Sequence, residues 1–190
     1  MMNGDEKPYP TDYNVVAFVF DSKELAEGIS EDVEANFMLD KYHIVAKSVV
    51  TKDENSEVHF HGPSGHGHQG AAAGFVTGGL LGLLGGPVGV LACSVGGAVV
   101  GGIAGHFHTG RSLHEEDMQA FGDALKPNSS AFLVLAGSAD TDNVKLSMDG
   151  YHATVVTLPV GEELCAEIGA AVAAGYGKEG ISGEEAADDA

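Results

Sequence analysis

The sequence predicts an α+β protein: a ferredoxin-like α/β sandwich that is split by an inserted, glycine-rich, apolar helical hairpin. Three observations predict this fold. Short apolar and β-branched runs alternate with amphipathic helical patterns on both sides of residues 62–111. The 28 glycines of the chain are concentrated in that intervening segment. At 190 residues, the chain has room for one ordinary domain with such an insertion.

The first half of the domain, residues 14–61, has the pattern β-α-β-β. It opens on an apolar run typical of a strand that is buried on both faces, and Asp21 and Ser22 then provide a helix start. The predicted elements are strand 14–20, helix 23–39, strand 42–51 and strand 57–61. The helix has apolar residues at three- to four-residue spacing, namely Leu25, Ile29, Val33, Phe37 and Met38.

The second half, residues 112–174, has the pattern α-β-α-β-α. Its first helix starts at a capping box, Ser112 to Glu115, and stops before Pro127. The elements that follow are strand 131–136, a short helix capped by Asp140 or Thr141, strand 151–158 and helix 162–174. Together the two halves extend the ferredoxin-like arrangement, in which helices cover one face of an antiparallel sheet. Residues 1–13 are expected to form a flexible leader and residues 175–190 an acidic disordered tail.

The inserted hairpin is predicted from two series of small residues that repeat every four positions. Helices over 70–86 and 88–105 would meet at the turn Gly86-Pro87. The helix-packing positions are Gly70, Gly74, Gly78, Gly82 and Gly86, then Gly89, Cys93, Gly97, Gly101 and Gly105. A glycine inside a helix costs about 0.8–1.0 kcal/mol relative to alanine, so another helix must pack closely against this stripe.

Two environments suit such a hairpin. In lipid, small residues at four-residue spacing let helices associate by close backbone contact. Each helix spans only about 26 Å at 1.5 Å per residue, which is short for a hydrocarbon core of about 30 Å. The alternative is a water-soluble oligomer, in which hairpins from several copies bury one another. Both environments make the protein a homo-oligomer.

Charge and cysteine content restrict the partners and the compartment. The formal net charge of -19 argues against nucleic acid, because phosphate binding needs clustered Lys and Arg. The first ten residues are polar and lack the apolar run of a secretory signal, so we expect the domain to lie in the cytoplasm. Cys93 and Cys165 form no disulfide framework and are expected to be packing residues.

Histidines flank the hairpin on both sides and are the only candidate for chemistry. They are His59, His61, His66 and His68 before it, and His106, His108 and His114 after it. A hairpin returns the chain to the side it left, so both groups are expected at its base. Their spacing suits zinc, nickel or copper ligation, or proton sensing near pH 6.5. The alternative is a flexible, solvated linker that holds no fixed ion.

Sequence motifs of catalysis are absent from the chain. It contains no phosphate-binding Gly-x-x-x-x-Gly-Lys loop, no Gly-x-Ser-x-Gly elbow and no Cys-x-x-Cys pair. We therefore expect a protein that is not an enzyme.

The chain resembles a family of bacterial and archaeal proteins, the domain of unknown function number 1269, whose members are described as membrane proteins. The resemblance rests on strand 15–20, on Tyr42-His-Ile-Val-Ala-Lys-Ser-Val-Val, on the Gly/Ala-rich hairpin and on residues 117–135. The most specific part of the resemblance is Leu-Lys-Pro-Asn-Ser-Ser-Ala-Phe-Leu-Val. The resemblance as a whole covers residues 14–174. It implies a split α/β domain around the hairpin and no established activity.

The expected function is therefore that of a membrane-associated homo-oligomer, anchored by its hairpins, with acidic α/β domains in the cytoplasm. Its partners would be further copies of itself and membrane lipid, and a complex with another protein is also open. The first alternative is a soluble scaffold whose hairpins form a hydrophobic tube or plug for a lipid-like molecule. The second is a metal- or pH-responsive module that uses the histidine clusters.

Overall fold

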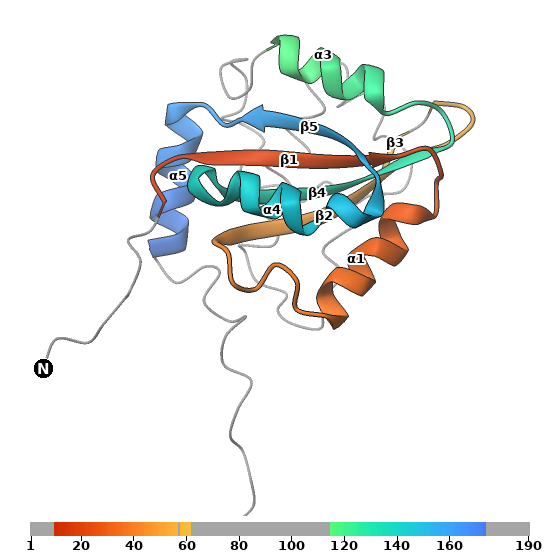
Figure 1. Ribbon diagram of the computed structural model, residues 1–190. Helices are drawn as coiled ribbons and strands as arrows, with labels where there is room; N and C mark the ends of the chain where they lie inside the picture. The colour runs from red at the N-terminus through yellow and green to blue at the C-terminus, as the bar shows by residue number, and fades with distance from the viewer. Residues whose placement is uncertain (1–9, 57, 62–114, 174–190) are drawn as a thin grey trace, which may run out of the picture.

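The computed structural model describes residues 10–56, 58–61 and 115–173 (Figure 1). The regular elements are β1 (Tyr13–Phe20), α1 (Leu25–Ala35), β2 (Ile44–Lys52), β3 (Val58–His61), α3 (Glu115–Ala124), β4 (Ser129–Gly137), α4 (Thr141–Ser147), β5 (Thr154–Pro159) and α5 (Glu162–Ala173). The predicted order of strands and helices is confirmed. The hairpin, the capping box, most of the leader and the acidic tail lie outside the described residues.

The strands form one five-stranded antiparallel sheet in the order β3-β2-β4-β1-β5. Strand β4 therefore lies between β2 and β1, although it follows them in sequence by a long stretch of chain. Strand bounds differ from the predicted ones by three residues or fewer. The largest difference is at β5, because a 3-10 turn over Asp149–Tyr151 and the left-handed residue His152 come first.

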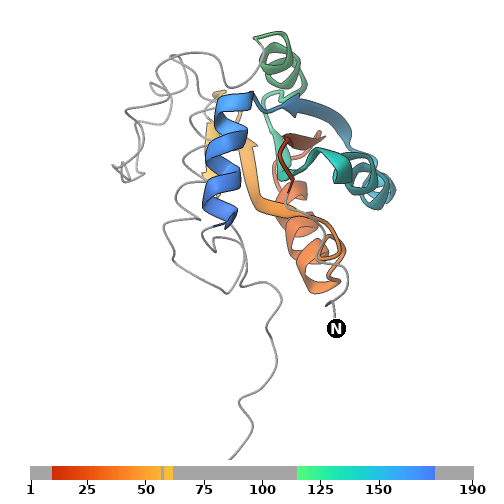
Figure 2. The same ribbon diagram turned by 90° about the vertical axis from the view of Figure 1, so that its left-hand side faces the viewer.

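Helices cover both faces of the sheet, so the prediction of helices on one face is wrong. The even-numbered residues of β1, such as Phe18, share a core with α1 and α4. The odd-numbered residues, such as Val15, share a second core with residues of α3 and α5. Figure 2 shows α5 on one side of the sheet and α1 and α4 on the other. An amphipathic pattern shows that a helix has a buried side, but not which sheet face it covers.

Helix α1 is shorter than predicted, and its apolar stripe differs. It ends at Ala35, and Phe37 takes a left-handed conformation with φ 52° and is 72% exposed. Leu25 is also largely exposed, whereas Leu39, beyond the helix, is buried. The apolar spacing that includes Leu25 and Phe37 therefore does not mark two buried residues, because Leu25 lies at the first position of α1 and the chain leaves the helical path before Phe37.

The start of α1 is capped by a residue distant in sequence. Neither Asp21 nor Ser22 provides the predicted side-chain cap, and Glu24 at the N-cap position provides none. Instead, the buried hydroxyl of Ser130 on β4 accepts a hydrogen bond from the Ala26 amide at 3.1 Å and donates one to the Ser22 carbonyl at 2.6 Å. This hydroxyl satisfies two backbone groups at the helix start.

Ser130→Ala is expected to lower the free energy of unfolding by about 1–3 kcal/mol. The substitution removes both hydrogen bonds and leaves the Ala26 amide, which is fully buried, without the acceptor it has in the native fold. Urea unfolding followed by circular dichroism, at one fixed protein concentration, measures the loss.

Ser22→Ala is the matched control, because its hydroxyl bonds only to the exposed Glu24 carboxylate. Its effect is expected to stay within about 0.5 kcal/mol. Equal losses for the two variants would contradict a capping role for Ser130.

Candidate functional site

Most of the site residues predicted from the sequence lie outside the described residues. This applies to all ten helix-packing positions and to five of the seven flanking histidines. The positions are Gly70, Gly74, Gly78, Gly82, Gly86, Gly89, Cys93, Gly97, Gly101 and Gly105, together with His66, His68, His106, His108 and His114.

His59 and His61 lie on β3, the edge strand that leads into the insert. They pair with Thr51 and Val49 of β2, so both side chains lie on one face of the strand. The His59 Nε2 atom is 3.4 Å from a carboxylate oxygen of Asp53, and the His61 Nε2 atom is 3.1 Å from the Thr51 hydroxyl. Each imidazole thus has a polar contact: His59 with the turn that follows β2, and His61 with β2 itself.

These two histidines do not form a metal centre with other described side chains. Within residues 10–56, 58–61 and 115–173, no three His, Cys, Asp or Glu side chains come together as a metal site requires. The remaining predicted ligands belong to the part of the chain that the structure does not describe.

Cys165 is a buried packing residue on α5. Its side chain belongs to the core formed with α3, and its thiol lies 3.3 Å from the Val160 carbonyl oxygen, to which it donates a hydrogen bond. Burial raises the pKa of the thiol, which disfavours the nucleophilic thiolate. This environment agrees with the packing role predicted for Cys165.

The most connected polar site of the described chain holds helix α4 in place. His43, just before β2, makes two hydrogen bonds to one carboxylate oxygen of Asp140, from its amide at 2.9 Å and from its Nδ1 atom at 2.8 Å. The preceding residue, Tyr42, bonds to the Ser147 hydroxyl at 3.0 Å. Adjacent residues of one loop therefore hold both ends of α4, and we call this the Tyr42-His43 clasp.

Two further contacts fix the same region. Asn14 on β1 donates to the Thr141 hydroxyl at the start of α4, at 2.9 Å. Beyond the end of α4, the Tyr151 hydroxyl donates to the Asp32 carboxylate on α1. Burial is the larger cause and the hydrogen bond to Asp32 the smaller one, and together they raise the pKa of Tyr151 to about 12. The hydrogen bond to Ser147 lowers the pKa of Tyr42.

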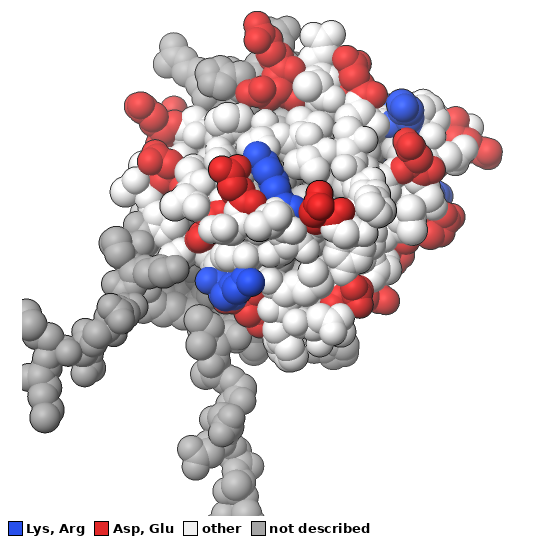
Figure 3. All heavy atoms as spheres, in the orientation of Figure 1, with Lys and Arg blue, Asp and Glu red and all other residues white. Residues whose placement is uncertain are grey.

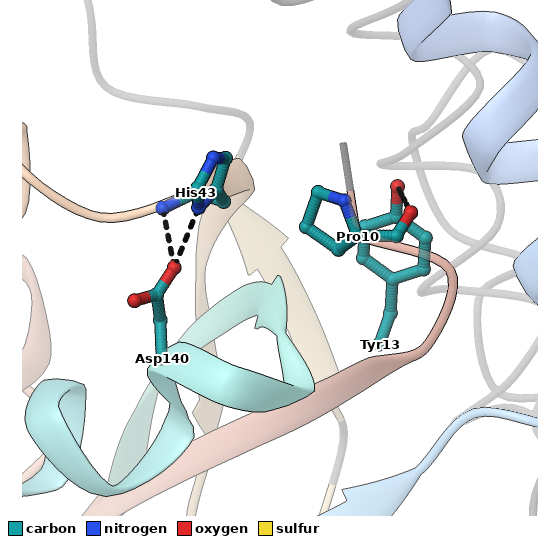
Figure 4. Close-up of polar contacts among 4 residues, drawn as sticks. All are labelled: Pro10, Tyr13, His43 and Asp140. Atoms are coloured by element: carbon teal, nitrogen blue, oxygen red, sulfur yellow. Dashed lines mark hydrogen bonds and ion pairs between the residues drawn. The ribbon is translucent and has the colours of Figure 1, made fainter. Parts of the chain in front are cut away.

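Beside the clasp, the start of the described chain folds over the end of β4. Figure 4 shows Pro10 beside Tyr13, whose hydroxyl donates to the Pro10 carbonyl at 2.9 Å. Gly137 allows this approach, because a Cβ there would lie 2.6 Å from Pro10 Cγ. Its amide also donates to the His43 carbonyl at 3.0 Å. The end of β4 and the starts of β1 and β2 thus meet at one corner of the sheet.

The His43–Asp140 pair is chemically a carboxylate that orients an imidazole. With Nδ1–H donating to Asp140, the basic lone pair resides on Nε2, as in the histidines of many proton-transfer sites. The His43 side chain is 31% exposed and that of Asp140 is 12% exposed. The pair joins the loop before β2 to the start of α4, which is the geometry of a structural clasp.

The sequence did not reveal the clasp. Asp140 was predicted as a helix cap, and it does occupy the N-cap position of α4, but its side chain makes no capping bond. It accepts from His43 instead, a residue 97 positions away. Only the adjacency of β2 and β4 brings the two residues together, and the sequence offers no local signal for that.

Comparison with family models identifies the chain. The model described as "Protein of unknown function (DUF1269)" matches residues 71–173, which is just over half of the chain. The chain belongs to this family. The match begins in the insert and ends with α5, so residues 14–70, where a resemblance was also expected, lie outside it. No curated protein and no solved structure matches the chain.

Membership of the DUF1269 family assigns no activity. The family description gives none, and the clasp residue Asp140 lies within the matched region whereas His43 does not. Among the helices that the structure describes, none is both long and apolar enough to cross a bilayer.

A double-mutant cycle tests the clasp. Asp140→Ala is expected to cost more stability than His43→Ala, because Asp140 accepts two bonds and the backbone bond persists whatever side chain stands at position 43. We expect about 1–3 kcal/mol for Asp140→Ala and a coupling energy of about 1 kcal/mol between the two sites. Urea unfolding of the two single variants and the double variant provides both values.

Asp142→Ala is the control, since this aspartate lies in the first turn of the same helix but its side chain is 98% exposed. Its expected effect is within about 0.5 kcal/mol. A cost for His43→Ala as large as that for Asp140→Ala, or zero coupling, would show that the clasp does not hold α4.

Proposed function

We propose that this protein is a non-enzymatic, membrane-associated homo-oligomer, anchored by the apolar hairpin 70–105, with its α/β domain in the cytoplasm. The observation that carries the proposal is the double register of small residues in a segment without Asp, Glu, Lys or Arg. A stripe of this kind favours close contact between helices, and lipid is the environment in which such contact is the main force for association.

The topology of the described domain supports an insert with a role of its own. Strand β3 ends at His61 and α3 begins at Glu115, so the segment between them enters the domain at an edge strand and leaves it at a helix. All five strands that the structure describes come from outside this segment, and β4 pairs with β2 and β1. The pairing of the described strands thus does not depend on the insert, which agrees with a separate role for it.

We further propose that the domain is ferredoxin-like. Omitting β3, the remaining strand order is β2-β4-β1-β5, with α1 joining β1 to β2 and α4 joining β4 to β5. Each helix crosses over an intervening antiparallel strand, and both helices lie on the same face, which is the split β-α-β arrangement. Strand β3, the insert and α3 are then one insertion between the second and third core strands, and α5 is an addition that covers the other face.

A non-enzymatic role agrees with the chemistry of the chain. Its sequence lacks the common nucleophile and phosphate-binding motifs, and its paired histidine and aspartate hold a helix. The net charge of -19 favours repulsion between the domains of neighbouring copies, so assembly needs surfaces where this repulsion is small.

Carbonate washing of membranes tests the anchor. The full chain is expected to remain in the membrane pellet after the wash and to enter solution only with detergent, because apolar helices stay in the bilayer when ionic contacts are lost. Immunoblots of the pellet and the supernatant measure the distribution. A variant that lacks residues 70–105 is the control and is expected in the supernatant.

Release of the full chain by carbonate as a discrete oligomer would contradict membrane anchoring. That result would support a soluble assembly instead, in which the hairpins form a hydrophobic tube or plug for a lipid-like molecule.

A further inference from the structure

The two edges of the sheet differ in what they leave open. On one edge, β3 has four residues and leads directly into the insert. On the other edge, β5 has six residues and pairs only with β1 within the described chain. Backbone groups along the outer side of an edge strand can pair with another strand. Pro159 limits such pairing at the end of β5, because proline has no amide hydrogen, and leaves residues 154–158 able to pair.

Large apolar side chains are exposed beside this edge. Leu146 on α4 is 74% exposed and Val155 on β5 is 43% exposed. Both line one shallow hollow, together with Ala153 at the turn into β5. Two of the four large exposed hydrophobic residues in the described chain therefore share one surface.

The position of α4 keeps this surface fixed. Val144 of α4 and Met148 at its end are buried in the core against the sheet. Leu146 therefore lies on the opposite side of the helix. The Tyr42-His43 clasp holds both ends of α4. The exposed leucine is thus presented by a rigid element, which reduces the entropy lost when it packs against a partner.

Charges of both signs lie around the same hollow. Lys145 is 3.6 Å from Asp142 and lines the hollow with Asp142 and Asp149. Figure 3 shows that acidic groups lie mostly around the rim of this face, whereas its middle is largely uncharged and carries both signs over α4. On a chain with net charge -19, a face of this composition repels a second acidic molecule less than a wholly acidic face would.

We propose that the α4-β5 surface, defined by Leu146, Val155, Lys145, Asp142 and Asp149, is an isologous interface with a second copy of this chain. Two copies of β5 pair edge to edge across a twofold axis, which extends the sheet from five strands to ten. A strand paired with itself by this symmetry runs antiparallel, as every pair in this sheet does. Leu146 and Val155 meet their counterparts, and Lys145 of each copy faces the carboxylates of the other.

Self-complementarity is what selects a second copy as the occupant. An isologous interface needs apolar groups that match themselves and charges of both signs on one patch, and this surface has both. The interface goes beyond the proposed function, because it lies on the α/β domain and holds whether or not the hairpin enters lipid. A negative result in the membrane fractionation therefore leaves this interface standing, and a negative result in the experiment below leaves the membrane anchor standing.

Cysteine cross-linking in the full chain tests the interface. In a Cys93→Ala background, with Cys165 buried, Val155→Cys provides one accessible thiol on the surface. A short bismaleimide, applied to dilute protein, is expected to give several-fold more covalent dimer than in the control Leu25→Cys. The control is well matched, because Leu25 is 48% exposed at the start of α1. Equal yields from the two positions would overturn the proposal.

Charge exchange separates a specific contact from a folding defect. In the Val155→Cys protein, Lys145→Glu makes the patch wholly acidic, and Asp142→Lys with Asp149→Lys makes it wholly basic. Each variant alone is expected to lose cross-linked dimer several-fold through repulsion between like charges. An equimolar mixture of the two, distinguished by tags of different size, is expected to recover it as the mixed dimer. No recovery in the mixture would overturn the pairing of Lys145 with the aspartates.

Discussion

Strand β4 is the element on which the rest of the domain depends. All nine of its residues are buried, and it pairs with β1 on one side and with β2 on the other. Its two neighbours come from before the insert, and β4 comes from after it, so the sheet exists only when both parts of the chain fold together.

Burial of β4 on both faces also determines where the helices lie. Its alternate residues, such as Phe132 and Leu133, belong to two different cores, so each face of the sheet must be covered. Helices α1 and α4 cover one face, while α3 and α5 contribute to the other. Ser130 then connects β4 to the start of α1 through two hydrogen bonds. The corner at Gly137 connects it to β2 and to the start of β1.

The sequence predicts well those features that depend on neighbouring residues. The order of the described strands and helices follows from apolar patterns, and the burial of residues 15–20 of β1 follows from their run of Val, Ala and Phe. Features that join distant residues are not predictable in this way. The cap of α1 by Ser130 and the His43–Asp140 pair depend on which strands become neighbours, and no local pattern encodes that. Phe37 has the spacing of a core residue, but the helix ends two positions earlier.

Native-state hydrogen exchange of the full chain is the most direct test of the central claim, that the segments before and after the insert form one cooperative domain through β4. The amides of β4 are expected to open with the same free energy as those of β1, near that of global unfolding, since the two strands share eight paired positions and both cores. Clearly lower opening free energies for β4 than for β1 would contradict the claim. That result would mean that residues 115–173 separate from residues 10–61 before the domain unfolds.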